Sequence, residues 1–343
     1  MSPSTEQSGR ARSPSAPEDA DGRAVASRPP SSDFISAMCA AHAPVQDAGR
    51  FPPGTIFGDW RLTAFIGRGG NGEVYCAEHV TLGTPAAVKV LIRDDERAKV
   101  RFEREAKVLA KLKSAAFPRF FAYGEVNPPT PSGGALNQPP QSYGMTSGAA
   151  YLAMELLEPG ELPTGDRAIA TFLLKVCDAV GELHALGYVH RDIKPGNILW
   201  RTGTTGILPV AVPVLADLGL VKNILKSDTG HPTPPVTLGG VGTPGYGAPE
   251  QVERGEATEA SDIHALGVLA DHCFNGNPPR AWKRIIEHAT SSIPTYRYPT
   301  VAALAHAIRW RNLWRNVGWT VLVMFLVGLF VDILIVVIVI WLW

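Results

Sequence analysis

The stretch YVHRDIKPGNILW, residues 188–200, places five polar or charged side chains within eight positions between apolar flanks. These side chains are costly to bury unless each one finds a partner or performs a task. We therefore expect these polar side chains to have a structural or chemical role in this segment. The segments before and after it indicate which role that is.

The composition excludes several classes of protein. The chain has 343 residues with 32 basic and 32 acidic side chains and a pI near 7.1, so its bulk charge does not indicate a nucleic-acid partner, and we expect none. Its four cysteines, Cys39, Cys76, Cys177 and Cys273, show no C-x-x-C spacing, which argues against a disulfide framework and a zinc site. The N-terminus lacks the apolar run of a secretory signal. We expect a protein of a reducing compartment.

Composition also divides the chain into three parts. Residues 1–53 are rich in Pro, Ser and Ala with few large apolar side chains, which predicts a disordered arm. Residues 55–310 mix strand-like and helix-like patterns, as a globular domain does. Residues 317–343 carry Asp332 as their only charge, and a helix of that length exceeds the hydrocarbon core of about 30 Å. This last part predicts a transmembrane helix rather than a buried core helix.

The flanks of this apolar segment predict its orientation. Arg309, Arg311 and Arg315 precede it, so the positive-inside tendency places the globular domain in the cytoplasm, at the cell membrane, as a single-pass protein. A short basic linker is expected between domain and span. Tryptophans cluster at both ends, as interfacial residues do. Asp332 is either a tolerated passenger or a bonding partner for a second helix, and the sequence leaves both readings open.

Within the globular part, the segment LTAFIGRGGNGEVYCAEHV breaks its strand-like alternation at Gly67, Gly69 and Gly72. The residues after Gly72 are strand-like, so we predict two strands joined by a glycine turn rather than a dinucleotide-binding strand and helix. Glycines there would let backbone amides approach a phosphate. The strand PAAVKVL follows with Lys89, which taken alone is an ordinary edge-strand lysine.

Further elements follow in order. Residues 96–112 form an amphipathic pattern with Val100, Val108, Leu109 and Leu112 on the apolar side, and a second helix is predicted over 171–187. Between them lie two predicted strands at 119–126 and 150–157. They are separated by a Pro-, Gly- and Ser-rich stretch at 127–148 that is typical of a disordered insertion.

The ordered set of glycine turn, strand lysine, helix glutamate, HRDIKPGN, ADLGL and GTPGYGAPE resembles eukaryotic-type (Hanks-type) serine/threonine protein kinases, in a membrane-anchored bacterial form. The resemblance covers residues 60 to about 308. It implies an α+β, two-lobed protein-kinase-like fold. The N-lobe would hold an antiparallel sheet and one helix, the C-lobe would be mostly helical, and ATP would bind between them.

The resemblance also implies roles for individual residues. Asp192 would accept or orient the proton of the substrate hydroxyl, Lys194 and Lys89 would contact phosphate oxygens, and Asn197 and Asp217 would hold Mg²⁺. Glu105 would pair with Lys89. A lysine two positions after Asp192 is similar to the Ser/Thr-specific pattern. The remaining residues expected to contact ATP are Ile66, Gly67, Gly69, Gly72, Val74, Ala87, Met154, Glu155, Leu157 and Leu199.

Other matches and departures concern the C-lobe. Glu250 of the APE triplet is expected to pair with Arg297, and Asp262 to tie the catalytic loop to a buried helix. Arg191 resembles the arginine of kinases controlled by phosphorylation, for which Ser227, Thr229, Thr233 and Thr237 are candidate sites. The hairpin between Asn197 and Asp217 is longer than usual, and Leu218 stands where Phe is usual. The segment after Leu269 looks shortened.

Two functions remain in view. The first is a membrane-tethered kinase that uses ATP and Mg²⁺, modifies Ser/Thr residues of protein substrates and phosphorylates itself, because a lipid anchor raises the effective concentration for self-association. The second is a catalytically weak or inactive kinase-like membrane scaffold. The intact polar residues favour the first, and the shortened C-lobe is the one feature that favours the second.

Overall fold

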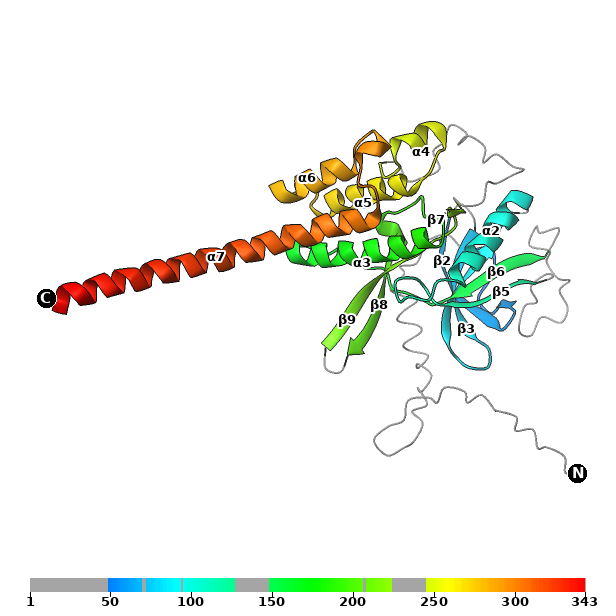
Figure 1. Ribbon diagram of the computed structural model, residues 1–343. Helices are drawn as coiled ribbons and strands as arrows, with labels where there is room; N and C mark the ends of the chain where they lie inside the picture. The colour runs from blue at the N-terminus through cyan, green and yellow to red at the C-terminus, as the bar shows by residue number, and fades with distance from the viewer. Residues whose placement is uncertain are drawn as a thin grey trace, which may run out of the picture.

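The computed structural model describes residues 49–69, 72–93, 95–126, 148–205, 208–223 and 245–342 (Figure 1). Most of the predicted arm and all but the last residue of the predicted insertion lie outside these ranges. The end of the arm does not, and there the prediction of disorder up to residue 53 is wrong. Phe51 is only 2% exposed because it packs into an apolar cluster with Phe57 and Tyr75.

The N-lobe is built on one antiparallel six-stranded sheet in the order β1-β2-β3-β4-β6-β5. The predicted glycine turn joins β2 to β3, with Gly67 opposite Val74, which confirms the strand–turn–strand reading. Alternation along β3 sends Tyr75 to one face of the sheet and Cys76 to the other. The strands are β1 Ile56–Phe57, β2 Trp60–Arg68, β3 Gly72–His79, β4 Pro85–Leu91, β5 Phe120–Val126 and β6 Ala149–Met154.

Helix α2 (Glu96–Leu109) belongs to the N-lobe. Asp95 begins it by accepting a hydrogen bond from the Ala98 amide at 2.7 Å, which satisfies one of the unpaired donors of the first turn. Its buried face carries Phe102 and Glu105, whereas Val100, which we predicted on the apolar side, is 45% exposed. The prediction failed there because the buried stripe runs through Phe102 instead.

The C-lobe is mostly helical and shares one large apolar cluster with α2. Two further strand pairs, β7 with β10 and β8 with β9, come between α3 and α4 in the sequence. The long hairpin predicted between Asn197 and Asp217 is the β8–β9 pair. The elements are α3 Asp166–Ala185, β7 Tyr188–Val189, β8 Ile198–Thr205, β9 Leu208–Leu215, β10 Lys222–Asn223, α4 Pro249–Arg254, α5 Glu259–Cys273, α6 Arg280–Ala289 and α7 Val301–Leu342.

The interval between Leu269 and Arg297, where we expected a shortened C-lobe, holds the end of α5 and then α6. Helix α6 is anchored by Trp282, which is fully buried and donates a hydrogen bond to Asp166 at the start of α3. The same tryptophan carries the Arg311 guanidinium of α7 over its ring at 4.3 Å. Through Trp282, this short interval connects α6 to both α3 and α7.

Helix α7 begins in the C-lobe and continues without a break, so the short linker that we predicted before residue 317 is not present (Figure 1). Its first turns bury Leu304 and Ile308 against the core, and its remainder projects from the domain. Within the part of the chain that the structure describes, no helix combines the length and the apolar character needed to cross a membrane. The transmembrane helix expected at 317–343 is therefore not found there.

Candidate active site

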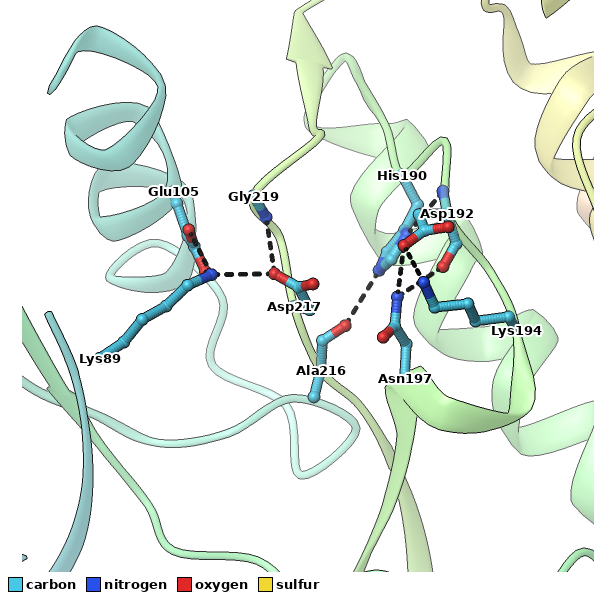
Figure 2. A network of polar contacts seen from close by, with 9 residues as sticks. All are labelled: Lys89, Glu105, His190, Asp192, Lys194, Asn197, Ala216, Asp217 and Gly219. Carbon is cyan, nitrogen blue, oxygen red and sulfur yellow. Dashed lines mark hydrogen bonds and ion pairs between the residues drawn. The ribbon is translucent and has the colours of Figure 1, made fainter. Parts of the chain in front are cut away.

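Lys89 lies at the junction of the two lobes and contacts one carboxylate from each. Its Nζ lies 2.7 and 2.9 Å from the two carboxylate oxygens of Glu105 on α2, which confirms the predicted pair. The same nitrogen is 2.9 Å from Oδ1 of Asp217, which follows β9 in the C-lobe (Figure 2). One ammonium therefore joins strand β4, helix α2 and the chain after β9.

The charges of this group perturb one another. The nearby Lys89 ammonium lowers the pKa of Asp217 to about 2. Burial raises the pKa of Glu105, against the attraction of Lys89. Burial alone would lower the pKa of Lys89, but the two carboxylates outweigh it and raise that pKa. Lys89 therefore stays charged, and Asp217 is the carboxylate that keeps its negative charge most firmly.

A second group of polar residues gathers on the loop between β7 and β8. Asp192 is buried, and its Oδ2 lies 2.7 Å from the Lys194 ammonium. Asn197 donates from Nδ2 to the backbone oxygen of Asp192 at 2.7 Å and to its Oδ2 at 3.0 Å (Figure 2). The other oxygen of Asp192, Oδ1, is buried and has no hydrogen-bond partner among the described residues. That oxygen is a buried acceptor that lacks a donor in the described part of the chain, while the contacts of Oδ2 hold the carboxylate in place.

Asp262, near the start of α5, fixes the backbone of this loop. Its two carboxylate oxygens accept hydrogen bonds from the amides of His190 and Arg191, each at 2.8 Å, as the sequence predicted. His184 contacts the same carboxylate at 2.8 Å. These contacts hold Arg191 at a φ of 74°, in the left-handed region that side chains rarely adopt. Asp217 of the first group also lies in this region, at a φ of 57°.

The predicted pair of Glu250 and Arg297 is present and buried. Two parallel contacts of 2.8 Å join the guanidinium to the carboxylate, and Ser261 donates to Glu250 at 2.7 Å. Burial works to raise the pKa of Glu250, but the hydrogen bonds from Arg297 and Ser261 hold it below its usual value. The pair thereby anchors the start of α4 to the end of the C-lobe.

The other residues expected to contact ATP lie in three places. Ile66, Val74, Ala87 and Met154 share one small apolar cluster on the face of the sheet that carries Cys76 and Leu156. Leu157 is buried, and Leu199 lies on β8 opposite Val214, but neither belongs to that cluster. Gly67, Gly69 and Gly72 lie at the turn between β2 and β3, where the Gly69 amide donates to the Gly72 oxygen at 2.8 Å.

Glu155 has contacts that the sequence did not indicate. Its carboxylate accepts from Nε of Arg201 at 2.7 Å and from Nη2 at 2.5 Å, and its amide donates to the Arg119 oxygen at 2.9 Å. The Arg201 contacts lower the pKa of Glu155 against the effect of burial. Arg201 lies on β8, in the unusually long hairpin, so no short-range pattern pointed to it. The pair joins the segment linking the lobes to that hairpin.

The chain belongs to the protein kinase domain family. The family model for the protein kinase domain matches residues 60–308. The chain is 32% identical over 286 residues to the serine/threonine-protein kinase Pkn1 of Myxococcus xanthus, covering 78% of this chain and 37% of Pkn1. It is 34% identical over 240 residues to PknA of Mycobacterium tuberculosis, covering 66% of this chain and 49% of PknA. The chain thus spans less than half the length of these curated relatives.

The kinase domain fold also matches a solved structure. The PknI kinase domain of Mycobacterium tuberculosis aligns with a TM-score of 0.51 at 21% identity, covering 76% of this chain and 99% of that domain. At this identity the match shows the fold alone. It agrees with the two-lobed α+β architecture that the motifs predicted.

Two parts of the expected kinase site lie outside the described residues. The candidate phosphorylation sites Ser227, Thr229, Thr233 and Thr237 are among them, and so is the tip of the glycine turn at residues 70 and 71. Arg191, their expected partner, is described. Burial lowers the pKa of its guanidinium, and its Nε has no hydrogen-bond partner among the described residues.

Proposed function

We propose that this protein is an ATP-dependent serine/threonine protein kinase that transfers the γ-phosphoryl group of ATP to Ser or Thr hydroxyls of proteins. The observation that carries the proposal is the buried Oδ1 of Asp192, which lacks a partner among the described residues while Lys194 and Asn197 hold the rest of the carboxylate. A substrate hydroxyl would donate the hydrogen bond that this oxygen lacks, once substrate binding brings the hydroxyl within reach of it. The names of the relatives support serine and threonine as the acceptors.

The geometry supports a division of labour between the two groups. Asp192 would accept the hydrogen bond of the substrate hydroxyl and orient its oxygen for attack, while Lys194, 2.7 Å from the same carboxylate, would contact the transferring phosphoryl group. Lys89 would contact phosphate oxygens of ATP, held in place by Glu105. Positioning and fixed charge account for most of the catalysis in such reactions, because phosphoryl transfer needs little covalent work from the protein.

Asn197 and Asp217 fit a divalent cation of the Mg²⁺ type. The Asn197 amide nitrogen is engaged by Asp192, and in Figure 2 its oxygen lies on the side of Ala216 and Asp217. Asp217 keeps its charge because Lys89 lowers its pKa to about 2. Within the described residues no three His, Cys, Asp or Glu side chains are grouped to hold a metal ion. Mg²⁺ does not need such a group, because it binds through one or two carboxylates together with substrate phosphates and water, and would neutralise charge on those phosphates.

The proposal extends to the membrane and to self-phosphorylation. The apolar residues of 317–343 carry a single charge, and the described side chains from Val321 to Val337 are exposed on the projecting part of α7. We infer that a lipid bilayer covers them and that the kinase domain faces the cytoplasm. Anchoring confines the copies to a surface, which raises their effective concentration and favours phosphorylation of one copy by another.

The first experiment measures phosphate transfer from labelled ATP with Mg²⁺ by the full chain in lipid nanodiscs, acting on itself and on a generic basic protein. Asp192→Asn is the matched variant, because it removes the charge and keeps the shape. We expect the rate to fall at least about a hundredfold in that variant. Transfer that is absent in the wild type, or unchanged in Asp192→Asn, would instead favour the kinase-like scaffold.

The tether has its own test. Membranes from cells that express the full chain are washed with alkaline carbonate, and the retained kinase is compared with a Val327→Arg, Ile333→Arg double variant. We expect the wild type to stay with the membrane and the variant to be released, because each central arginine costs about 2.5–3.5 kcal/mol of insertion. Release of both proteins would contradict a spanning anchor and leave the catalytic proposal untouched.

A further inference from the structure

The segment just before the kinase domain packs against the back of the glycine hairpin. Phe51 is 2% exposed and lies edge-on to Phe57 at 5.0 Å and to Tyr75 at 6.1 Å between ring centroids. Its amide donates to the Tyr75 hydroxyl at 3.0 Å. The neighbouring Arg50 amide donates to Oε2 of Glu73 at 2.9 Å. Two consecutive backbone donors thus bind two side chains of β3.

Glu73 and Tyr75 join these donors into one network. The Tyr75 hydroxyl donates to Oε2 of Glu73, the oxygen that also accepts from the Arg50 amide. Oε1 of Glu73 accepts from Nε of Arg68 at 2.9 Å across the hairpin. Glu73 is 1% exposed, so its charge depends on these partners. Burial works to raise the pKa of Glu73, but the bonds from Tyr75, Arg50 and Arg68 outweigh it and lower that pKa.

The fit at residue 49 leaves no room for a side chain. A methyl group added to Gly49 would lie 2.6 Å from the Tyr75 hydroxyl and 2.6 Å from a ring carbon of Phe65. The backbone of this segment therefore lies directly on the two aromatic rings, which meet edge-on across β2 and β3 with their centroids 5.4 Å apart. This close approach requires glycine at position 49.

The network and the proposed nucleotide pocket lie on opposite faces of one strand. Val74 and Cys76 of β3 belong to the small apolar cluster that contains several residues expected to contact ATP, whereas Tyr75 packs with Phe51 on the other side. Glu73 lies opposite Arg68, and this is the last pair of β2 and β3 before the glycine turn. Any shift of Glu73 or Tyr75 would be passed to the turn through the backbone of the same strand.

We propose that residues 49–51, called here the brace, position the phosphate-binding hairpin through Glu73 and Tyr75, so that the segment preceding the kinase domain sets nucleotide affinity. This inference rests on the proposed function, because it assigns the brace to the ATP site. Tyr75 and Glu73 are positioning residues: they touch the strand that holds the hairpin and not the nucleotide. A ligand, a modification or a partner that removes the brace would weaken ATP binding without touching Lys89 or Asp192.

The test compares three variants of the full chain. Tyr75→Phe removes the hydroxyl that bridges Phe51 and Glu73, and Gly49→Ala pushes the brace and the Tyr75 ring apart without changing any residue of β3. Tyr151→Phe is the matched control, since that tyrosine lies in the same apolar cluster on β6. The measurements are the dissociation constant of ADP by calorimetry, KM for ATP, kcat at saturating ATP, and hydrogen exchange of the amides of residues 66–74.

In the two brace variants we expect ADP binding and KM for ATP to weaken about two- to tenfold, the range that one lost hydrogen bond accounts for. kcat should stay within about twofold, and the hairpin amides should exchange faster, while Tyr151→Phe resembles the wild type in all four readouts. Equal behaviour of the three variants, or a loss of kcat with KM unchanged, would overturn the brace. A wild type that binds no nucleotide would refute the proposed function, and the brace with it; normal wild-type binding with unchanged variants refutes the brace alone.

Discussion

Two buried ion pairs stabilise the kinase domain, and they differ in how fully their atoms are satisfied. The Arg297 guanidinium bonds Glu250 through two nitrogens and also donates to the backbone oxygens of Ser291 and Ala260, each at 2.8 Å. The Arg297 side chain is 0% exposed and that of Glu250 is 4% exposed. This pair has little capacity left for anything else.

Lys89, by contrast, shares one positive charge between two carboxylates. The side chain of Glu105 is 3% exposed, but that of Asp217 is 48% exposed, so one side of the group is open to solvent. We call Glu250 and Arg297 the closed pair, because all their partners are protein atoms, and Lys89, Glu105 and Asp217 the open group. The closed pair serves the structure alone, whereas the open group can exchange a protein contact for one with a phosphate or a metal ion. The difference predicts that mutations in the first pair act on stability and mutations in the second act on chemistry.

The largest effect is expected for Arg297→Met, which leaves Glu250 buried without its partner. Removing one member of a buried pair costs about 3–5 kcal/mol in the free energy of unfolding. Urea unfolding of the full chain in detergent measures this cost. The double variant Arg297→Met, Glu250→Gln should recover part of the loss, because the uncompensated charge is gone. A single variant within 1 kcal/mol of the wild type would contradict the assignment of a closed pair.

Lys89→Met should instead reduce phosphate transfer about 10²- to 10³-fold, the effect of removing one preorganised electrostatic contact to the transition state. Its effect on the free energy of unfolding should be smaller than that of Arg297→Met, since Glu105 can take up a proton and Asp217 can reach water. Single-turnover transfer and urea unfolding are measured on the same preparation. Should Lys89→Met destabilise the fold as much as Arg297→Met, the distinction between open and closed groups would fail.

Much of this comparison was predictable from the sequence, because each motif occupies a short segment and the family order joins them. Lys89, Glu105 and Asp217 come from three separate segments, and no spacing rule alone brings them together. The resemblance did so, and it also paired Glu250 with Arg297. What it could not supply were contacts peculiar to this chain. The bond between Glu155 and Arg201 depends on the long β8–β9 hairpin, and the docking of Phe51 depends on a residue that composition alone assigned to a disordered arm.

Helix α7 is a second case in which composition alone did not predict the structure. The change from mixed to apolar composition near residue 317 predicted a boundary with a linker before it, but the backbone continues as one helix across it. Composition indicates whether a segment favours a polar or an apolar environment, but it does not show where a helix ends. The contact that holds this junction, Arg311 with Asp166 at 2.7 Å, joins residues far apart in the sequence.

A smaller effect is expected for Ser261→Ala, which tests how complete the closed pair is. The Ser261 hydroxyl donates to Glu250 at 2.7 Å, and its oxygen accepts from the Thr258 amide at the start of α5. Losing both bonds should cost about 1 kcal/mol of unfolding free energy and leave phosphate transfer unchanged. Ser291→Ala is the control, because Arg297 uses only the backbone oxygen of Ser291, and it should stay within about 0.5 kcal/mol of the wild type. Equal losses in the two variants would remove Ser261 from the pair.

The smallest effect is the acid titration of Asp217, which tests how open the other group is. Its pKa is lowered from 3.8 to about 2 by Lys89, so the folded state favours the charged form. The resulting stabilisation is fully present above pH 4 and is lost as the pH falls toward 2. Because half of the side chain is exposed, solvent screening keeps the contribution below about 1 kcal/mol.

Urea unfolding of the wild type and Asp217→Asn at several pH values measures this contribution. The difference between the two proteins should be constant above pH 5 and shrink between pH 4 and 2. The same comparison with Glu250→Gln should give a larger difference, since the carboxylate of Glu250 is almost fully buried and its pKa is also lowered. A larger difference for Asp217 than for Glu250 would reverse the ranking and make the group between the lobes the stronger structural element.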